Sequence, residues 1–261
     1  MPSKPAKGIE ELLGKFPKER PHLSPEMAQV HGMLLRANRE RATTFSKLSN
    51  YLERWMHKRV ASERQRAETI QNQNVLEIGG GTLNHLKFES DKSHYDVIEP
   101  LYDHYGEKPQ KTEVNCFYED ISEISDDAVY DRIISIATLE HLTDLPATVA
   151  KSGMILSESG LFQAGYPNEG GMLWGLSWRV STGLEYWLRS GHNYAEHMRY
   201  EHVNDASEIK LIVKYFFEDC RFFQFPIPVF HLGFYTYLLA KNPNPDRCRD
   251  YLARLDASVS L

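Results

Sequence analysis

The sequence predicts an α/β fold in which a mostly parallel sheet of seven strands carries helices on both faces. From Asn74 onward, short apolar runs alternate with segments of helical character, which is typical of a parallel sheet with crossover helices. The first of these runs ends in three glycines, Gly79–Gly81, as expected where a strand turns sharply into a helix. A chain of 261 residues is long enough for one such domain with appended segments.

Residues 1–72 are predicted to form an N-terminal helical extension or lid. A short helix is expected around Ile9–Leu13, and Ser24 followed by Pro25 is typical of a helix start. Apolar side chains then recur at helical spacing, which indicates two helices within residues 24–70 that bury one face.

The domain that follows covers residues 73–243 and contains the seven strands. They are expected at residues 75–78, 94–99, 113–117, 130–137, within 154–166, and at 220–226 and 231–240. Helices are predicted over 143–153 and 205–218, the second with Asn204 as its N-cap. The last two strands are close enough in sequence for an antiparallel hairpin. Residues 244–261 are assigned to a C-terminal tail.

One block, residues 168–203, does not fit the alternation and is predicted to be an inserted helical cap over the substrate side of the sheet. Its aromatic and titratable residues include Trp174, Trp178, Trp187, His192, His197 and His202. Steps of five residues turn a helix by about 140°, so the three histidines would not share one helix face. No metal site is therefore predicted here, and each histidine is interpreted as a surface residue or as a second base.

The end of the first strand favours a cationic ligand over a phosphate. A phosphate-binding loop would continue with Lys and Ser or Thr, whereas Thr82-Leu83-Asn84-His85 follows the glycines. Glu77 places a negative charge inside the motif, which also disfavours an anion. S-adenosylmethionine (SAM) fits this loop, because its methionine end carries an ammonium and its sulfonium is cationic.

Polar residues also follow the next strands, at the edge where an open parallel sheet binds its ligands. Glu99 ends the second strand, 18 residues after Gly81, where its two oxygens can accept both hydroxyl hydrogens of an adenosine ribose. Asp120 follows the third strand, where its side chain can accept an adenine amino group. Ala137 to His141 follow the fourth strand, where cofactor and substrate would meet.

In this order, these residues resemble the class I SAM-dependent methyltransferases of the small-molecule type, which have a Rossmann-like fold. The matching residues are Glu77-Ile78-Gly79-Gly80-Gly81-Thr82, Glu99, Glu119-Asp120-Ile121, and Tyr130-Asp131-Arg132-Ile133-Ile134-Ser135 followed by Leu139-Glu140-His141-Leu142. The resemblance covers residues 74–166, and residues 204–241 by architecture only.

The resemblance implies how the cofactor would be bound. Gly79 and Gly81, with Gly80 between them, would let the backbone approach the methionine moiety, and Glu77 would orient this loop and its amino group. The remaining cofactor contacts would be Glu99 with the ribose, Asp120 and Ile121 with the adenine, and the backbone of Ala137 with the methionine end. Glu99 and Asp120 have a simpler alternative as solvated loop acids.

The candidate catalytic residues are His141 and Glu140. A hydroxyl acceptor needs a base, and histidine exchanges protons near neutral pH. Glu140 would orient His141 or contact an amine acceptor. The alternative is that His141 only caps the start of the following helix.

The expected reaction is in-line methyl transfer from SAM to a small-molecule acceptor, most simply a hydroxyl of a saccharide or of a lipid-linked intermediate. The Trp-rich cap motivates this acceptor, since aromatic faces stack on sugars and suit a lipid headgroup interface, although plain packing of the cap also explains it. The alternatives are N- or C-methylation of another small metabolite and a catalytically inactive SAM-binding module. A NAD-dependent oxidoreductase is disfavoured by the glycine spacing and by Glu77.

The charge is unevenly distributed along a chain whose net charge is −6. Residues 1–72 hold 14 basic and 8 acidic residues, and the rest of the chain holds 16 and 28. The basic extension would suit peripheral contact with an anionic membrane or would be a solvated helical face, while the acidic whole argues against a nucleic-acid partner. Three scattered cysteines, no apolar run long enough to span a membrane and no visible secretory signal predict a cytoplasmic location.

Overall fold

The computed structural model describes residues 7–28, 31–32, 46–66, 73–90, 92, 94–101, 109–183, 186–188, 191 and 194–259. Within these ranges the strands form one seven-stranded sheet with the order β3-β2-β1-β4-β5-β7-β6. The pairs from β3 through β5 are parallel, and β7 is antiparallel to both β5 and β6. The predicted α/β fold with a mostly parallel sheet and a final hairpin is confirmed.

The strands agree closely with those expected from the sequence. They are β1 Asn74–Ile78, β2 His94–Ile98, β3 Cys116–Tyr118, β4 Tyr130–Ile136, β5 Leu156–Pro167, β6 Phe217–Pro226 and β7 Gly233–Pro243. β3 starts later than predicted because Pro109–Glu113 forms the 3₁₀ helix η3, and the amide of Val114 still bonds to the Lys111 carbonyl.

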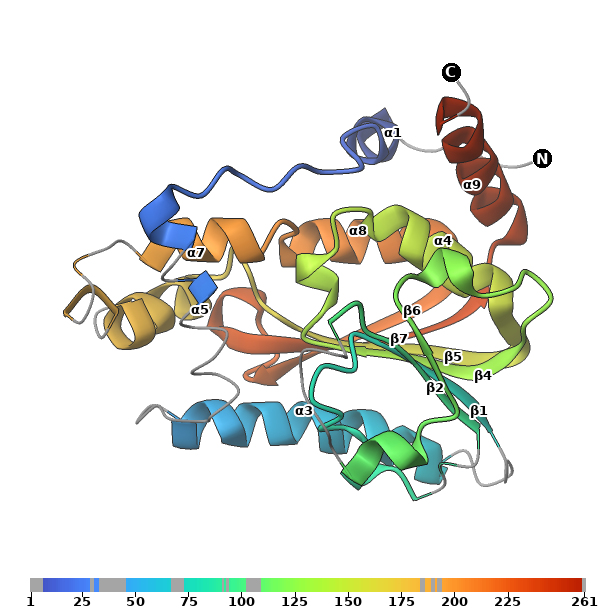
Figure 1. Ribbon diagram of the computed structural model, residues 1–261, viewed down its shortest axis with the longest axis horizontal. Coiled ribbons are helices and arrows are strands. Elements are labelled where there is room, and N and C mark those ends of the chain that lie inside the picture. The colour runs from blue at the N-terminus through green and yellow to red at the C-terminus, as the bar shows by residue number, and fades with distance from the viewer. Residues whose placement is uncertain are drawn as a thin grey trace.

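Helices cover both faces of the sheet (Figure 1). α3 (Ser46–Arg66) lies on one face, and α4 (Leu145–Ile155) and α8 (Ala206–Phe216) lie on the other. α1 (Lys7–Leu13) packs against α8, and α9 (Pro245–Val259) packs against α4. None of the helices within the described ranges combines the length and the apolar character needed to cross a membrane.

Two apolar clusters, one for each face of the sheet, hold the layers together. Along β4, Ile133 belongs to the cluster with α4 and α8, whereas Ile134 belongs to the cluster with Met56 and Val60 of α3. This division follows from the alternation of side chains across a strand. Burying one such side chain contributes about 2 kcal/mol, so the layers are held mainly by apolar burial.

The N-terminal extension is helical as predicted, whereas the C-terminal region is more ordered than a tail. The helix expected around residues 9–13 is α1, and α3 is one of the two helices predicted within residues 24–70; much of the other falls on residues 33–45, outside the described ranges. The predicted tail is the helix α9, because Cys248 and Tyr251 are buried in the cluster with α4.

The block between β5 and α8 contains helices, as predicted for the cap. They are α5 (Met172–Trp178), a π-helical turn (Arg179–Gly183) and α7 (Tyr194–Glu201). The N-cap of α8 is Asp205 and not Asn204, since Asp205 and Glu208 form a reciprocal capping box. Asn204 instead donates to the carbonyls of Leu139 and Leu142 at 2.9 and 2.7 Å.

The expected helix directly after the glycines is absent from the described chain there, which continues in turns and a single 3₁₀ turn, η1 (Leu86–Phe88). Leu83 has a φ of 59°, a left-handed conformation that interrupts a helix. His85 and Glu89 are then buried and paired at 2.8 Å, and Glu89 also accepts from Arg132 of β4 at 2.9 and 3.1 Å. This buried ionic network replaces the solvated face that a surface helix would have.

Candidate functional site

The ends of β1, β2 and β4 lie side by side at one edge of the sheet. Ile78 of β1 is opposite Ile98 of β2 and Ser135 of β4. The residues that follow each strand are therefore neighbours in space. This register brings the glycine loop, Glu99 and the segment that starts at Ala137 together, as the sequence predicts.

The three glycines have different reasons to be glycine. Gly79 and Gly81 have φ values of 77° and 50°, in the left-handed region. A Cβ on Gly79 would lie 2.1 Å from Thr138 Oγ1, and one on Gly80 would lie 2.4 Å from a methyl carbon of Val97. A Cβ on Gly81 would meet nothing within 4 Å. Packing thus excludes side chains at the first two positions, while the third borders open space.

Glu99 ties the glycine loop to the end of β2. Its Oε2 accepts from the Gly81 amide at 2.7 Å, and its Oε1 accepts from the Leu101 amide at 3.0 Å. The residue is almost fully buried. Because each carboxylate oxygen can accept more than one hydrogen bond, both remain able to bind a further donor.

Glu77 is a buried acid beneath the same loop. The Tyr95 hydroxyl donates to its Oε2 at 2.8 Å. Burial raises the pKa of Glu77 to about 8; the bond from Tyr95 opposes this shift, and the negative charges of Glu89 and Glu99 add to it. A cation beside the loop would stabilise the ionised form. Tyr95 was missed from the sequence because a buried tyrosine in a strand looks like ordinary core.

Asp120 and Ile121 follow β3. Asp120 is exposed at the surface, and Ile121 lies in the core. The Asp120 carboxylate accepts from the Ser122 amide at 2.9 Å and caps the 3₁₀ helix η4 (Ile121–Glu123). Ile121 is buried in the apolar cluster. Asp120 is thus placed at the ligand edge of the sheet, and its local capping bond accounts for its conformation.

Ala137 marks a strained turn at the end of β4. Its φ is 52°, which is uncommon for a residue with a Cβ, and its amide donates to the Gly165 carbonyl at 2.7 Å. The chain then enters the 3₁₀ helix η5 (Leu139–His141). Residues held in such conformations cluster at ligand sites.

Glu140 and His141 lie together, as predicted, and meet two residues of the cap. Glu140 is 2% exposed, and its Oε2 has no hydrogen-bond partner among the described atoms. His141 Nδ1 lies 2.8 Å from the carbonyl oxygen of Glu201 and 3.4 Å from Glu201 Oε2. The His141 ring also contacts the His202 ring edge to face, with centroids 4.8 Å apart.

The pairing of His141 with Glu201 shifts the pKa of both side chains. Burial disfavours the charged imidazolium, but the hydrogen bond to Glu201 and the charge of Glu140 outweigh burial and raise the pKa of His141 above its ordinary value. Burial acts to raise the pKa of Glu201, yet its bond and attraction to His141 dominate and lower it to about 2. The two side chains therefore behave as a coupled pair.

The histidines of the cap point in different directions, as the five-residue spacing predicts. His202 Nδ1 lies 2.5 Å from Glu169 Oε1, and Glu169 also accepts from the Trp174 indole at 3.0 Å. His197 is buried next to His31 of the N-terminal extension. His192 lies outside the described residues.

The N-terminal extension reaches this site through Arg20, a residue that was not singled out from the sequence. Arg20 donates to the carbonyl oxygens of His141, Tyr200 and Glu201 at 2.7, 2.6 and 3.2 Å. Glu201 was also missed, although Glu201-His202 repeats the Glu-His order of Glu140-His141 and offered a clue. Nothing local marks Arg20, since its contacts join residues more than 100 positions apart.

A family model described as a methyltransferase domain matches residues 52–214. The chain belongs to this methyltransferase family. It is a class I enzyme that uses SAM as its cofactor, which agrees with the resemblance of the glycine loop and its neighbours. No curated protein matches the sequence significantly.

Solved structures share the fold of this methyltransferase at low sequence identity. The plantazolicin methyltransferase BpumL, in complex with a triazolic desmethylPZN analog and SAH, has 14% identity and a TM-score of 0.56, with 90% of this chain and 99% of that chain covered. A possible exported protein from Bordetella parapertussis has 12% identity and a TM-score of 0.54, with 91% and 79% covered.

The site of this methyltransferase fits its cofactor in charge and in shape. The open space beside Gly81 admits a ligand against the backbone. The buried Glu77 carboxyl, whose raised pKa falls when a cation approaches, complements a sulfonium and an ammonium. Glu99 presents two fixed oxygens next to that space. A phosphate-bearing ligand would gain no such stabilisation from the Glu77 carboxyl and would meet repulsion from the Glu99 carboxylate.

Proposed function

We propose that this enzyme methylates an oxygen or nitrogen of a small-molecule acceptor that binds between η5 and the cap. The observation that carries the proposal is the group of Glu140, His141 and His202 beside the end of β4. In a parallel sheet this edge is where ligands bind, and the glycine loop is its neighbour in the register.

The cofactor roles carried over from the family are part of this proposal. Glu99 would bind the ribose, Asp120 and Ile121 the adenine, and the glycine loop with Glu77 and the backbone of Ala137 the methionine end. When bound, SAM supplies a methyl group on a cationic sulfonium. The fixed orientation of Glu99 and the loop would hold that group in line with the acceptor, and much of the catalysis would come from this positioning.

His141 would be the general base. Its Nδ1 faces the carbonyl oxygen of Glu201, which can only accept, so Nδ1 carries a hydrogen and Nε2 is left to accept one. Nε2 would take the proton that the acceptor hydroxyl releases when its oxygen receives the methyl group. The unpartnered Oε2 of Glu140 would bind a further hydrogen of the acceptor, and it would equally favour an amine.

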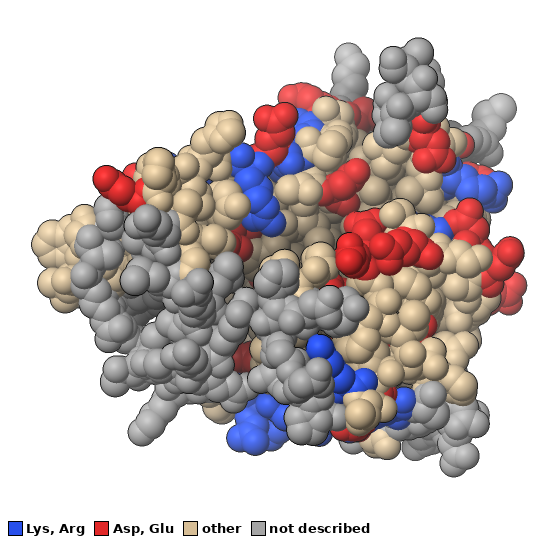
Figure 2. Space-filling model, viewed as in Figure 1, with Lys and Arg blue, Asp and Glu red and all other residues tan. Residues whose placement is uncertain are grey.

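The cap supports an acceptor with an apolar or sugar portion. Its exposed apolar side chains are Met172, Leu176, Val180, Trp187 and Leu188. In Figure 2 the end of the molecule that carries α5, at the left, shows mostly uncharged side chains. Exposed apolar patches of this kind mark binding surfaces, so a saccharide or lipid-linked acceptor, with peripheral membrane contact, is part of the proposal. A cytoplasmic location is also proposed, and its support is that Cys116, Cys220 and Cys248 are free thiols.

The test is an assay of methyl transfer from labelled SAM to a panel of saccharides, lipid-linked sugars and amines, with wild type and His141→Gln. We expect turnover on one class and a strong loss of kcat in the variant, while calorimetry shows unchanged binding of S-adenosylhomocysteine. Cofactor binding without turnover on any class would favour the inactive SAM-binding module.

A further inference from the structure

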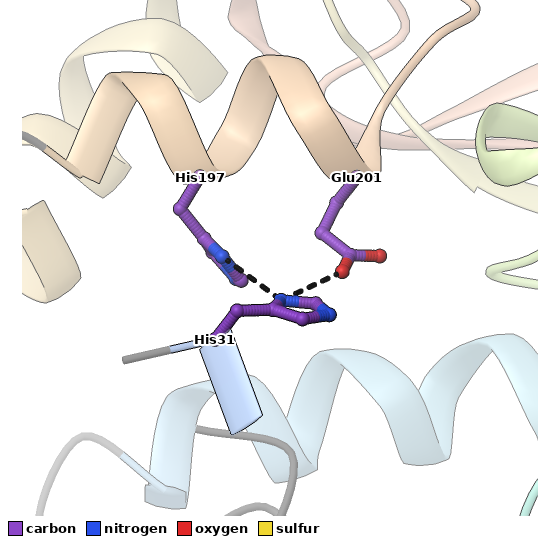
Figure 3. Close-up of side chains that lie close together, drawn as sticks. All are labelled: His31, His197 and Glu201. Carbon is purple, nitrogen blue, oxygen red and sulfur yellow. Dashed lines mark hydrogen bonds and ion pairs between the residues drawn. The ribbon is translucent and has the colours of Figure 1, made fainter. Parts of the chain in front are cut away.

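Two histidines and a carboxylate converge next to the proposed active site from two distant parts of the chain (Figure 3). His197 and Glu201 are one turn apart on the same face of α7, and His31 approaches them from the N-terminal extension. His31 Nδ1 lies 3.4 Å from His197 Nδ1 and 3.2 Å from Glu201 Oε1. All three ligand atoms lie within 4.8 Å of one another.

The two separations that involve His31 Nδ1 match the spacing of ligands around a metal ion. Zinc binds imidazole nitrogen and carboxylate oxygen at about 2.0–2.1 Å, and two ligands of a tetrahedral ion are then roughly 3.3–3.4 Å apart. The separation of the two histidine nitrogens is also longer than the about 2.9 Å of a good N–H hydrogen bond. An ion between the three atoms explains the convergence better than a direct contact between the two rings.

The surroundings are suited to an ion that remains accessible from solvent. His197 is buried, whereas the side chains of His31 and Glu201 are 17% and 23% exposed. The ring of His31 packs edge to face against Tyr200 at 5.1 Å, and His197 packs against Tyr194 at 5.3 Å. These aromatic contacts orient the imidazoles, and the partial exposure leaves an entry path and room for a fourth ligand.

We propose that His31, His197 and Glu201 bind one Zn²⁺ ion, which fastens the N-terminal extension to α7. Two imidazoles and one carboxylate with an open position form a ligand set typical of zinc, and an oxygen-preferring ion such as Mg²⁺ would not select it. The three histidines of the cap cannot share one face of a single helix. This set uses only one of them and takes its second histidine from a segment 166 residues away.

The ion would also act on the proposed catalytic group, and this part of the inference rests on the proposed function. Glu201 Oε1 faces His31, and Glu201 Oε2 faces His141 Nδ1 at 3.4 Å. A carboxylate fixed by a metal ion is held in one orientation, so Glu201 would serve as a positioning residue for His141. Metal binding itself does not depend on the identity of the reaction.

The test uses the full chain, stripped with a chelator, dialysed and titrated with ZnCl₂ in a calorimeter, with metal content measured by mass spectrometry. We expect one Zn²⁺ per chain, no binding of MgCl₂, and at least tenfold weaker zinc binding in His31→Ala and in His197→Ala. His22→Ala, which removes an exposed histidine from the same extension, is the matched control and should bind zinc like wild type.

S-adenosylhomocysteine affinity, measured on every variant, reports whether the fold and the cofactor site are intact. No stoichiometric zinc, or zinc binding that survives both substitutions, would overturn the proposal. Zinc binding that is lost only in His202→Ala would place the ion in the cluster of Glu140, His141 and His202 and would also overturn it. Failure of methyl transfer with zinc binding intact would count against the proposed function alone.

Discussion

The cofactor side and the cap side of the site are built in different ways. On the cofactor side, the functional groups end neighbouring strands, and backbone bonds fix them, as the Gly81 amide fixes Glu99 at 2.7 Å. On the cap side, the groups meet across long stretches of chain, as Arg20 meets His141 and His31 meets His197. The sheet alone positions the first side, whereas the second also requires the N-terminal extension to be docked.

Because the two sides are built differently, cofactor binding and turnover should respond to different substitutions. Substitutions in the sheet should change stability and cofactor affinity, and substitutions in the cap or the extension should change turnover while cofactor affinity is preserved. The substitutions below test whether cofactor affinity and turnover depend on separate sides of the site.

Arg132→Met should produce the largest effect, because it breaks a buried ion pair. Arg132 and Glu89 both have fully buried side chains, and the salt bridge joins them at 2.9 Å. Removing one member of a buried ion pair costs about 3–5 kcal/mol in the free energy of unfolding, and Glu89 keeps its contact with His85. Urea unfolding measures this loss, and the double variant Arg132→Met/Glu89→Leu should recover a large part of it. A loss under about 1 kcal/mol in the single variant would show that the network does not support the cofactor side.

His141→Ala should lower kcat by about 100- to 1000-fold, in line with the usual contribution of a general base. Its affinity for S-adenosylhomocysteine should stay within about twofold of wild type, because His141 is not among the residues proposed to bind the cofactor. Steady-state kinetics and calorimetry on the same preparation test both statements. A loss of cofactor affinity as large as the loss of kcat would erase the division between the two sides.

Glu77 should make cofactor binding depend on pH. Burial raises the pKa of this carboxyl from its ordinary value of 4.5 to about 8. The hydrogen bond from Tyr95 opposes the shift, and the charges of Glu89 and Glu99 add to it. In the free protein Glu77 therefore holds a proton below pH 8, and the stability of the free protein falls as pH rises from 4.5 to 8. A cationic ligand favours the ionised form, so its binding releases that proton.

The affinity for S-adenosylmethionine, whose sulfonium is a fixed cation, should accordingly rise by up to about tenfold per pH unit between pH 6 and 8 and then level off. Glu77→Gln keeps the shape of the side chain and should remove this slope. Calorimetry in buffers of different ionisation enthalpy counts the released proton directly. A flat profile in wild type, or an unchanged slope in the variant, would contradict the role of Glu77.

Arg20→Ala should have the smallest effect, about a tenfold loss in kcat/KM for the acceptor, because it removes charge-assisted bonds to three backbone carbonyls. Arg221→Ala, at an exposed arginine of β6, is the matched control and should behave like wild type. The affinity for S-adenosylhomocysteine should not change in either variant. Equal kinetics in the two variants would show that docking of the extension does not matter for turnover.

The strand ends on the cofactor side lie close to those predicted from the sequence. Strand ends in a parallel sheet are set by local apolar runs, so Glu77, Glu99 and Ala137 could be placed from the pattern alone. The irregular segment after Gly81 could not, because buried His85 and Glu89 look like the polar face of a surface helix. Arg132, which bonds to Glu89, lies in β4, and that pairing is visible only in three dimensions.

The cap side was predicted only in part. His141 and Glu140 follow β4 directly and were proposed from the sequence, as was His202 as a surface residue or second base, whereas Glu201 and Arg20 join them through contacts that no local pattern encodes. The N-cap of α8 was misplaced by one residue for a related reason. Asn204 is as good an N-cap as Asp205, but its side chain is already bonded to the carbonyls beside η5.

We propose that the glycine loop and Glu99 bind the adenosyl cofactor. Calorimetric titration of wild type and Glu99→Ala with S-adenosylhomocysteine, with NADH as the comparison ligand, tests this claim. Loss of two hydrogen bonds to a carboxylate should cost about 3 kcal/mol, so we expect micromolar binding to wild type and roughly 100-fold weaker binding to the variant. NADH should not bind. Equal affinity in the two proteins, or binding of NADH in place of S-adenosylhomocysteine, would contradict the claim.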